Sequence, residues 1–158
     1  MSYQTAQICL NGHVINGNFE GYPIDNQNYC QECGSKTIHE CPDCKSNIRG
    51  DLDYGVGYEH LQFAPKHCYN CGSPYPWIKE KLKAAKELAD EIEELSEEER
   101  EKLKGTIDDL LIEGPRTELA AIRFKKLLPK AKVEIANGLK NIIVDIASEY
   151  AKKLLIGS

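Results

Sequence analysis

The sequence predicts an α+β protein, in which a cysteine-rich N-terminal domain of short β-hairpins precedes a C-terminal α-helical bundle or hairpin. All seven cysteines of the 158 residues lie before position 72. Up to Trp77 the chain is rich in Gly, Asn and Tyr, whereas beyond it apolar residues recur at three- and four-residue steps. Pro74 and Pro76 mark this change, because neither fits within a continuing helix or a central strand. We therefore expect domains at 1–77 and 78–158.

The cysteines of the first domain occur in regularly spaced pairs, and one histidine completes the set. The four pairs are Cys9 with His13, Cys30 with Cys33, Cys41 with Cys44, and Cys68 with Cys71. A turn with this spacing directs two side chains toward one point, and a tetrahedral Zn²⁺ needs two such turns. The spacing therefore predicts a double zinc ribbon with two zinc ions, eight ligands and no cysteine left over. His39, His60 and His67 are expected at the surface or as hydrogen-bond donors near the ligands.

Two pairings of these four turns are compatible with the spacing. In the sequential pairing, the first two turns hold one zinc and the last two hold the other. In the cross-braced pairing, as in RING-type ubiquitin ligases, the first turn shares an ion with the third. Glycine follows the last cysteine of both the second and the fourth turn, as Gly34 and Gly72, which favours the sequential pairing. Spacing alone does not decide between them.

The predicted zinc sites are structural, and we expect no enzyme. A catalytic zinc keeps three protein ligands and an open position, whereas eight ligands fill two tetrahedra. The sequence contains no Glu placed beside a ligand as in zinc deaminases, no Ser-His-Asp order and no phosphate loop. The whole chain has only three Phe and one Trp. Metal binding is therefore expected to supply most of the folding energy of the first domain.

The second domain shows helical periodicity interrupted by clear boundary signals. One amphipathic helix is expected over 78–95. A capping box at Ser96 and Glu99 opens the next, which runs to about residue 112 and ends at Gly114-Pro115. A third helix begins at Thr117. Pro129 kinks it or starts a last helix over about 130–155, which has a wide apolar face.

Two charge runs distinguish the helical domain. Residues 87–101 contain nine acids and one Arg, whereas 116–132 contain six basic residues and one Glu. One interpretation is that both are solvated faces that meet across a helical hairpin. Alternatively, the basic stretch contacts phosphate or an acidic partner, or lies on a membrane surface. Its basic residues are Arg116, Arg123, Lys125, Lys126, Lys130 and Lys132.

Composition restricts location and partners. The net charge is −5 and the pI near 5.4, which argues against a protein whose whole surface binds nucleic acid. The start at residues 1–5 lacks the basic and apolar segments of a signal peptide, and no run of eighteen apolar residues predicts a membrane span. Cysteine pairs with metal-ligand spacing and no secretion signal indicate a reducing compartment. We therefore expect a cytoplasmic protein.

The order of these motifs resembles a bacterial family classed as a domain of unknown function. The resemblance rests on Cys-x-x-Gly-His at 9–13, Tyr-Cys-x-x-Cys-Gly at 29–34, Cys-Pro-x-Cys at 41–44 followed by Ile-Arg-Gly at 48–50, and Cys-x-x-Cys-Gly-x-Pro-Tyr-Pro-Trp at 68–77. The helical part, from Gly114 to Lys126 and around residues 145–149, is similar as well. The resemblance implies a double zinc-ribbon head on a helical tail in a bacterium, and it implies no activity.

The resulting functional hypothesis is a non-enzymatic adaptor or regulatory protein. The zinc-stabilised head would present Tyr54, Tyr58, Tyr69, Tyr75 and Trp77, although Tyr75 and Trp77 have an alternative role in pinning the head to the helices. The helical tail would bind a protein partner or a second copy of the chain. The alternative is a nucleic-acid-binding zinc-ribbon protein that uses the basic stretch 116–132, with exposed head aromatics stacking on bases.

Overall fold

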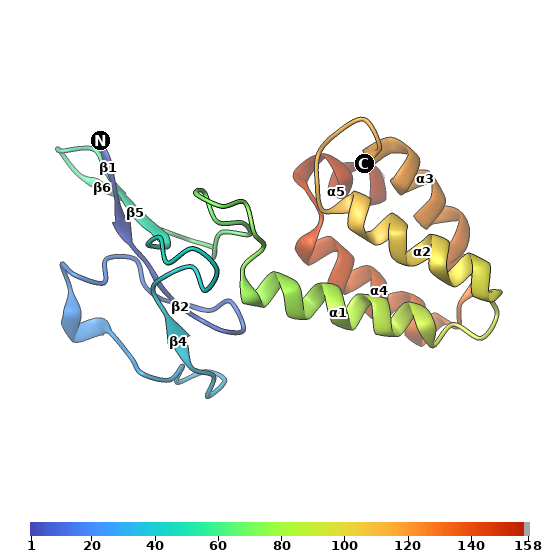
Figure 1. Cartoon of the computed structure of the whole chain (residues 1–158), viewed down its shortest axis with the longest axis horizontal. Coiled ribbons are helices and arrows are strands. Elements are labelled where there is room, and N and C mark those ends of the chain that lie inside the picture. Colours follow the sequence, from blue (N-terminus) through green and yellow to red (C-terminus); the bar gives the residue numbers. More distant parts are fainter. Residues whose placement is uncertain (157–158) are drawn as a thin grey trace. The chain divides into compact units, whose positions relative to one another are not determined.

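The computed structural model describes residues 1–156, and the chain divides into two compact units (Figure 1). The first unit comprises Met1–Lys79 and the second begins at Glu80, so the division lies in the first turn of helix α1 (Pro76–Asp90). Short strands and clustered cysteines form the first unit, and helices follow in the second. The fold is therefore α+β, as the sequence predicts.

Two small antiparallel sheets organise the first unit. One has the strand order β1-β5-β6 and the other β3-β2-β4. The strands are β1 (Ser2–Thr5), β2 (Gln7–Cys9), β3 (Val14–Asn16), β4 (Thr37–Ile38), β5 (Arg49–Asp53) and β6 (Tyr58–Glu59). Only the buried Ala6 separates β1 from β2, and its N–H donates to the carbonyl of Ile48 over 2.7 Å. The N-terminal segment therefore contributes a strand to both sheets.

The core of the first unit is small. Its largest fully buried side chains are Ile8, Ile48 and Tyr75, and Trp77 is only 3% exposed. The rings of Tyr75 and Trp77 stack with centroids 4.9 Å apart, and Trp77 Nε1 donates to the carbonyl of Pro65 over 2.9 Å. A core of this size leaves much of the folding energy to be supplied by other interactions.

Two long connections in the first unit run between its cysteine turns, and we call them arm 1 (residues 14–29) and arm 2 (residues 45–67). Arm 1 contains β3 and a 3₁₀ turn, η1 (Pro23–Asp25), whereas arm 2 contains β5 and β6. The arms meet where Asp51 N–H donates to the carbonyl of Gly17 over 2.8 Å. A Cβ on Gly17 would lie 2.0 Å from Asp51 Oδ1, so only glycine permits this approach.

The second unit contains helices packed on an aliphatic core. The elements are α2 (Glu97–Leu110), α3 (Thr117–Leu127), the 3₁₀ turn η2 (Leu128–Lys130), α4 (Val133–Ile146) and α5 (Glu149–Ile156), together with the remainder of α1. Fully buried side chains include Leu103, Ile107, Phe124, Leu139 and Ile143. The predicted capping box is present: Ser96 Oγ accepts from Glu99 N–H, and the Glu99 carboxylate accepts from Ser96 N–H, both over 3.1 Å.

The helix expected over 130–155 is two helices, and this prediction was wrong. Ala147 adopts an extended conformation with ψ of 153°, and the Ser148 N–H then donates to the carbonyl of Leu110 over 3.0 Å. The Ser148 hydroxyl accepts from Ala151 N–H over 3.2 Å and so caps α5. The break allows the last helix to change direction while Ala147 and Ala151 stay fully buried.

Two other helix boundaries differ from expectation. α1 begins at Pro76, because proline is tolerated in the first turn of a helix, and it ends at Asp90. Ile92 and Leu95 remain buried although they lie beyond its end. Pro129 lies in the 3₁₀ turn η2, between α3 and α4.

Within residues 1–156, no helix has the length and apolar character that crossing a membrane requires.

Candidate metal centres

Three of the four cysteine turns have the same backbone structure. In each Cys-x2-Cys turn the first cysteine N–H donates to the carbonyl of the serine five residues later, and its own carbonyl accepts from the residue after the second cysteine. That residue has a positive φ: 75° at Gly34, 65° at Lys45 and 77° at Gly72. Lys45 is the only non-glycine residue with positive φ in the described chain. The turn at Cys41 and Cys44 therefore belongs to the same type although it lacks the glycine.

The turn between Cys9 and His13 is wider and is formed differently. Cys9 ends β2 and His13 precedes β3, so the two ligands flank a hairpin turn. The Cys9 N–H donates to the His13 carbonyl over 3.0 Å, and Gly12 closes the turn with φ of 90°. A Cβ at Gly12 would lie 3.2 Å from the Trp77 side chain. Gly12 is thus required both by conformation and by the close approach of Trp77.

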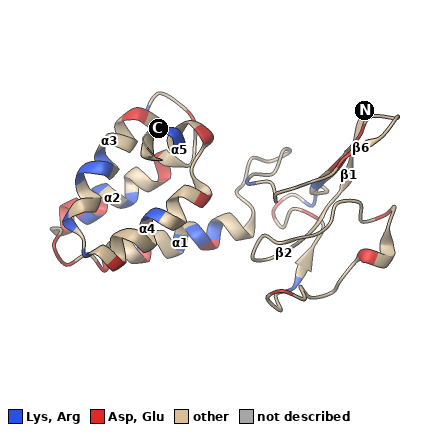
Figure 2. Cartoon of the chain, turned by 180° about the vertical axis from the view of Figure 1, so that it is seen from behind, with Lys and Arg blue, Asp and Glu red and all other residues tan. Residues whose placement is uncertain are grey.

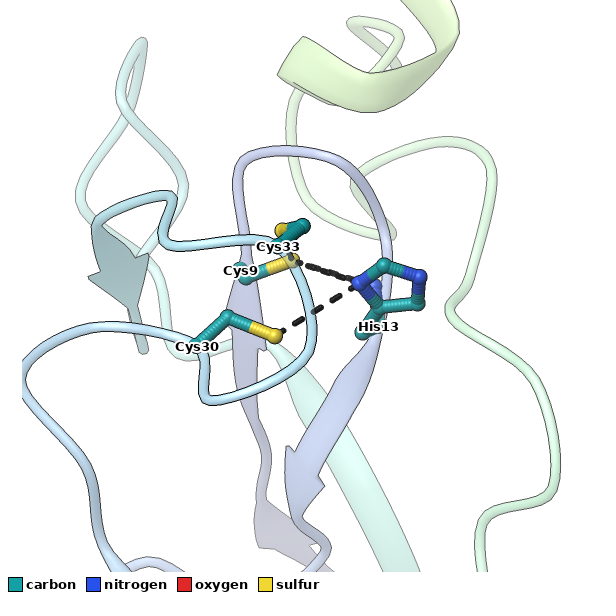
Figure 3. A group of neighbouring side chains, drawn as sticks. All are labelled: Cys9, His13, Cys30 and Cys33. Atoms are coloured by element: carbon teal, nitrogen blue, oxygen red, sulfur yellow. Dashed lines mark hydrogen bonds between the residues drawn. The ribbon is translucent and has the colours of Figure 1, made fainter.

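The first cluster combines Cys9, His13, Cys30 and Cys33 (Figure 3). His13 turns its Nδ1 toward the sulfurs, 3.4 Å from Cys9 Sγ and 3.5 Å from Cys30 Sγ. Cys9 Sγ and Cys33 Sγ are 3.8 Å apart. Cys9 and Cys30 are buried, whereas Cys33 and His13 are exposed. The cluster therefore lies at the surface of the first unit, with one side covered.

The second cluster combines Cys41, Cys44, Cys68 and Cys71. Cys41 Sγ lies 3.8 Å from Cys71 Sγ, and Cys44 Sγ lies 3.6 Å from Cys68 Sγ. The first cysteine of each turn is again buried, and Cys71 is exposed. The two clusters show that the turns pair sequentially, first with second and third with fourth.

Both clusters fit a tetrahedral metal ion. Zinc–sulfur bonds of about 2.3 Å place two sulfurs of a tetrahedron about 3.8 Å apart, and a zinc–nitrogen bond of about 2.0–2.1 Å places sulfur and nitrogen about 3.5 Å apart. The observed separations match both values, and the ligand atoms of each cluster all lie within 4.8 Å of one another. The clusters are thus consistent with two metal ions, one held by three thiolates and an imidazole and the other by four thiolates.

Polar groups around the clusters stabilise the thiolate form of one cysteine in each cluster, the exposed Cys33 and the half-buried Cys44. Hydrogen bonds from Ser35 and then Asn11 lower the pKa of the Cys33 thiol to about 5. Hydrogen bonds from Ser46 and Asn70 lower the pKa of the Cys44 thiol to about 6. Such donors compensate anionic sulfur next to a cation.

Two of the buried cysteines, Cys9 and Cys41, behave in the opposite way. Burial raises the pKa of the Cys9 thiol, and it raises the pKa of the Cys41 thiol to about 11. Since the metal ligand is the thiolate, a bound cation has to displace the protons of these two groups. Each cluster therefore combines a cysteine that is readily ionised, Cys33 or Cys44, with a buried one, Cys9 or Cys41, that depends on the metal charge.

The asparagines and serines around the clusters are functional residues that the sequence interpretation missed. A serine follows two residues after the second cysteine in all three Cys-x2-Cys turns, as Ser35, Ser46 and Ser73. This repeat was visible in the sequence and would have identified the turn at Cys41 as equivalent to the other two. Asn11 and Asn70 carried no such signal, because each bonds a sulfur in the other turn of its cluster.

The remaining histidines and aromatic residues of the head have other roles. His39 stacks on Phe19 with ring centroids 4.1 Å apart, and His60 bonds Asp51. Tyr54, Tyr58 and Tyr69 are about half exposed, as a contact surface requires. The candidates Tyr75 and Trp77 are unsuited to external contacts, because both are buried inside the first unit.

The basic stretch 116–132 is only partly neutralised. Arg116 pairs with Asp109 and Lys130 pairs with Glu99, so two of its charges meet acids of α2. No ion pair within residues 1–156 involves the other four, which are Arg123, Lys125, Lys126 and Lys132. Charges of both signs are distributed over the helices (Figure 2). Two residues of the stretch therefore form ion pairs with α2, and the other four are cations without an ion pair in the described chain.

Fold and clusters together define an α+β protein with two four-residue clusters in its N-terminal unit that are consistent with two metal ions. The chain belongs to the family described as "Uncharacterized protein conserved in bacteria (DUF2321)", whose model matches residues 2–155. The bacterial resemblance noted from the motifs is thereby confirmed over nearly the whole chain. Neither a curated protein nor a solved structure matches it.

Proposed function

We propose that this chain is a zinc-binding, non-enzymatic adaptor or regulatory protein whose two zinc ions are structural. The observation that carries the proposal is the completeness of both clusters. Each offers four nitrogen and sulfur ligands, the number that structural zinc sites use, whereas catalytic sites keep three and an open position. Thiolate and imidazole are ligands that suit zinc.

The small core of the first unit supports a structural role for the metal. Its apolar interior is limited to a few side chains around Ile8, Ile48 and Tyr75. Structural zinc contributes about 10–16 kcal/mol to the folding of small zinc domains, which is comparable to the whole stability of an ordinary domain. The zinc ions would therefore hold the two arms and the surfaces that they carry.

The interaction surfaces would be the exposed tyrosines of the head and the helical unit. Tyr54, Tyr58 and Tyr69 are 47%, 48% and 52% exposed, and tyrosine is enriched at protein interfaces. On α3, Leu119 and Ile122 are exposed next to each other along the helix. A protein partner, or a second copy through the helical unit, would cover such side chains. Free thiols in metal-ligand geometry are in keeping with a reducing, cytoplasmic location.

Metal analysis of the purified chain tests the structural half of this proposal. We expect two zinc ions per chain, and one in Cys44→Ser, since that variant removes a ligand of the second cluster only. Trp77 is the only tryptophan, so its fluorescence reports unfolding of the first unit. Fewer than two ions in the wild type, after purification without chelator, would contradict the eight-ligand assignment.

A reconstitution experiment tests the adaptor function. Proteins captured by the tagged full-length chain after nuclease treatment are identified, purified and titrated against it. We expect a purified partner to bind the wild type and to bind Tyr58→Ala or Tyr69→Ala at least about fivefold more weakly, as for interface aromatics. If the partner bound both variants as tightly as the wild type, or bound only in the presence of nucleic acid, use of this surface by a protein partner would be contradicted.

A second candidate function is nucleic-acid binding through the basic stretch. Four cations of this stretch have no acidic partner in the described chain, which favours it. Binding to labelled single-stranded DNA should then fall about 50-fold between 50 and 200 mM salt, as expected for four phosphate contacts to a single strand. The double variant Lys125→Gln/Lys126→Gln should weaken it, whereas Lys83→Gln on α1 serves as the control. No binding at 50 mM salt would exclude this function.

A further inference from the structure

A cavity of about 590 Å³ opens where the two arms of the first unit meet. Arm 1 runs between His13 and Cys30 of the first cluster, and arm 2 runs between Cys44 and Cys68 of the second. Arm 1 contributes eight of the twelve lining residues and arm 2 contributes four. Each wall of the cavity is therefore fixed at both ends by a metal-ligand turn.

The walls of this cavity are held by internal hydrogen bonds. In arm 1, Asn16 Nδ2 donates to the carbonyl of Tyr22 and to Asn26 Oδ1, each over 2.8 Å. The contact of Gly17 with Asp51 joins arm 1 to arm 2 without room for a side chain. A ligand would thus enter a largely preformed site, without a large cost for ordering the loops.

The charged groups that line the cavity are predominantly negative. Asp25 and Asp51 contribute two carboxylates, and no Lys or Arg is among the lining residues within the described chain. Asp51 is only 7% exposed, and its carboxylate accepts from His60 Nδ1 over 3.0 Å and from Leu61 N–H over 2.8 Å. These bonds fix the position of the carboxylate and leave lone pairs free for a further donor.

Two aromatic rings contribute to the same lining. Tyr22 and Tyr58 are 55% and 48% exposed, and both border the cavity. Tyrosine rings attract cations through their negative faces, and a guanidinium also stacks on them because it is planar and weakly hydrated. The same guanidinium forms paired hydrogen bonds with carboxylates. The fixed carboxylate of Asp51 and the exposed carboxylate of Asp25, beside tyrosine rings, are therefore suited to a guanidinium group.

We propose that this cavity binds an organic cation of the guanidinium type, such as an arginine side chain. The cation would lie between the tyrosines and donate to the carboxylates of Asp25 and Asp51. This assignment does not rest on the adaptor function, since a free guanidinium compound and an arginine of a protein partner would use the same groups.

The zinc-loaded full-length chain, titrated with N-acetyl-arginine amide, tests the proposal. N-acetyl-citrulline amide has nearly the same shape without the charge and is the matched probe. We expect the arginine compound to bind at least about tenfold more tightly, because the charge interacts with both carboxylates and rings. Amide resonances that shift should lie in residues 14–29 and 45–67. Equal binding of the two compounds, or shifts confined to other residues, would overturn the proposal.

Variants locate the site within the cavity. Asp25→Asn removes an exposed carboxylate and should weaken binding of the arginine compound about fivefold, and Tyr58→Leu should do the same. Glu20→Gln, on the same arm but outside the lining, is the control and should change affinity less than about twofold, because salt screens an exposed charge that does not contact the ligand. Unchanged Trp77 fluorescence verifies folding. Wild-type affinity in both Asp25→Asn and Tyr58→Leu would refute the site.

Two further probes distinguish the source of the cation. Agmatine presents the guanidinium as a free small molecule, and acetyl-Ala-Arg-Ala-amide presents it within a peptide. Tighter binding of the peptide assigns the site to a protein partner, and tighter binding of agmatine assigns it to a small molecule. Binding of neither overturns the proposal. Arginine-amide binding in a chain that captures no partner would leave this site intact while removing support for the adaptor function.

Discussion

The side-chain amide of Asn11 donates to Cys33 Sγ over 3.3 Å. Asn70 is placed in the same way toward Cys44 Sγ, at 3.6 Å. In both cases the asparagine lies in one turn of a cluster and the sulfur in the other, so the amide joins the two turns. The two centres thus share a donor arrangement although their turns differ in length and one contains histidine.

Replacing Asn11 tests the importance of this donor. Asn11→Ala removes a hydrogen bond to the Cys33 thiolate, and we expect the zinc affinity of the first centre to fall about 10- to 100-fold, the usual effect of losing a partner of a metal ligand. Competition with a chromophoric chelator measures the affinity. Asn137→Ala is the matched control, because Asn137 is exposed and lies in α4, outside the first unit. Equal affinities of wild type and Asn11→Ala would contradict the role of the amide.

The left-handed conformation at Lys45 gives a stability prediction. Two equivalent turns place glycine there, and a residue with a Cβ pays about 1–2 kcal/mol for this conformation, whereas glycine costs about 0.5–1 kcal/mol in chain entropy. Lys45→Gly should therefore stabilise the zinc-loaded first unit by up to about 1 kcal/mol in urea unfolding followed by Trp77 fluorescence. Lys36→Gly, in an extended bridge with Tyr29, should destabilise it. Destabilisation by both changes would show that Lys45 carries no strain.

Acidification should release the metal. The pKa of Cys33 is lowered to about 5 and that of Cys44 to about 6, from an ordinary value of 9.0. A thiol with a depressed pKa stabilises the folded state fully above its unfolded pKa, and this contribution is lost as the pH falls through the folded value. Protons also compete with the metal for each sulfur. We expect zinc to be retained at pH 7 and released below about pH 6, measured with a zinc-sensitive dye.

The control for this experiment is a return to pH 7 with added zinc, which should restore both metal content and Trp77 fluorescence. Complete retention of zinc at pH 4 would contradict the dependence of the centres on these thiolates.

The break between α4 and α5 predicts a local effect in the second unit. Ser148→Ala removes the hydroxyl that accepts from Ala151 N–H and should destabilise the helical unit by about 1 kcal/mol. Ser148→Asn keeps a side-chain acceptor at the cap and should retain most of the stability. Thermal unfolding followed by circular dichroism at 222 nm measures both. If the two variants were equally stable, Ser148 would not act as a cap.

Local sequence patterns were sufficient where one turn determines the structure. The spacing of Cys30 and Cys33 identifies a metal-ligand turn because two residues between cysteines direct both sulfurs to one side. In the same way, Ser96 and Glu99 identify the start of α2, since both partners of the capping box lie within one turn. The α+β class followed from the change in period after Trp77.

The sequence by itself thus determined the ligand turns, the fold class and the family resemblance, all of which depend on residues close together in the chain. The tertiary structure decided which turns come together in one cluster, that Tyr75 and Trp77 are buried, and that the last helical segment breaks at Ala147. It also brought Asp25 and Asp51 to the lining of one cavity. The physical reason is that these features arise when the arms close and the helices pack, and the contacts that fix them join residues far apart in sequence.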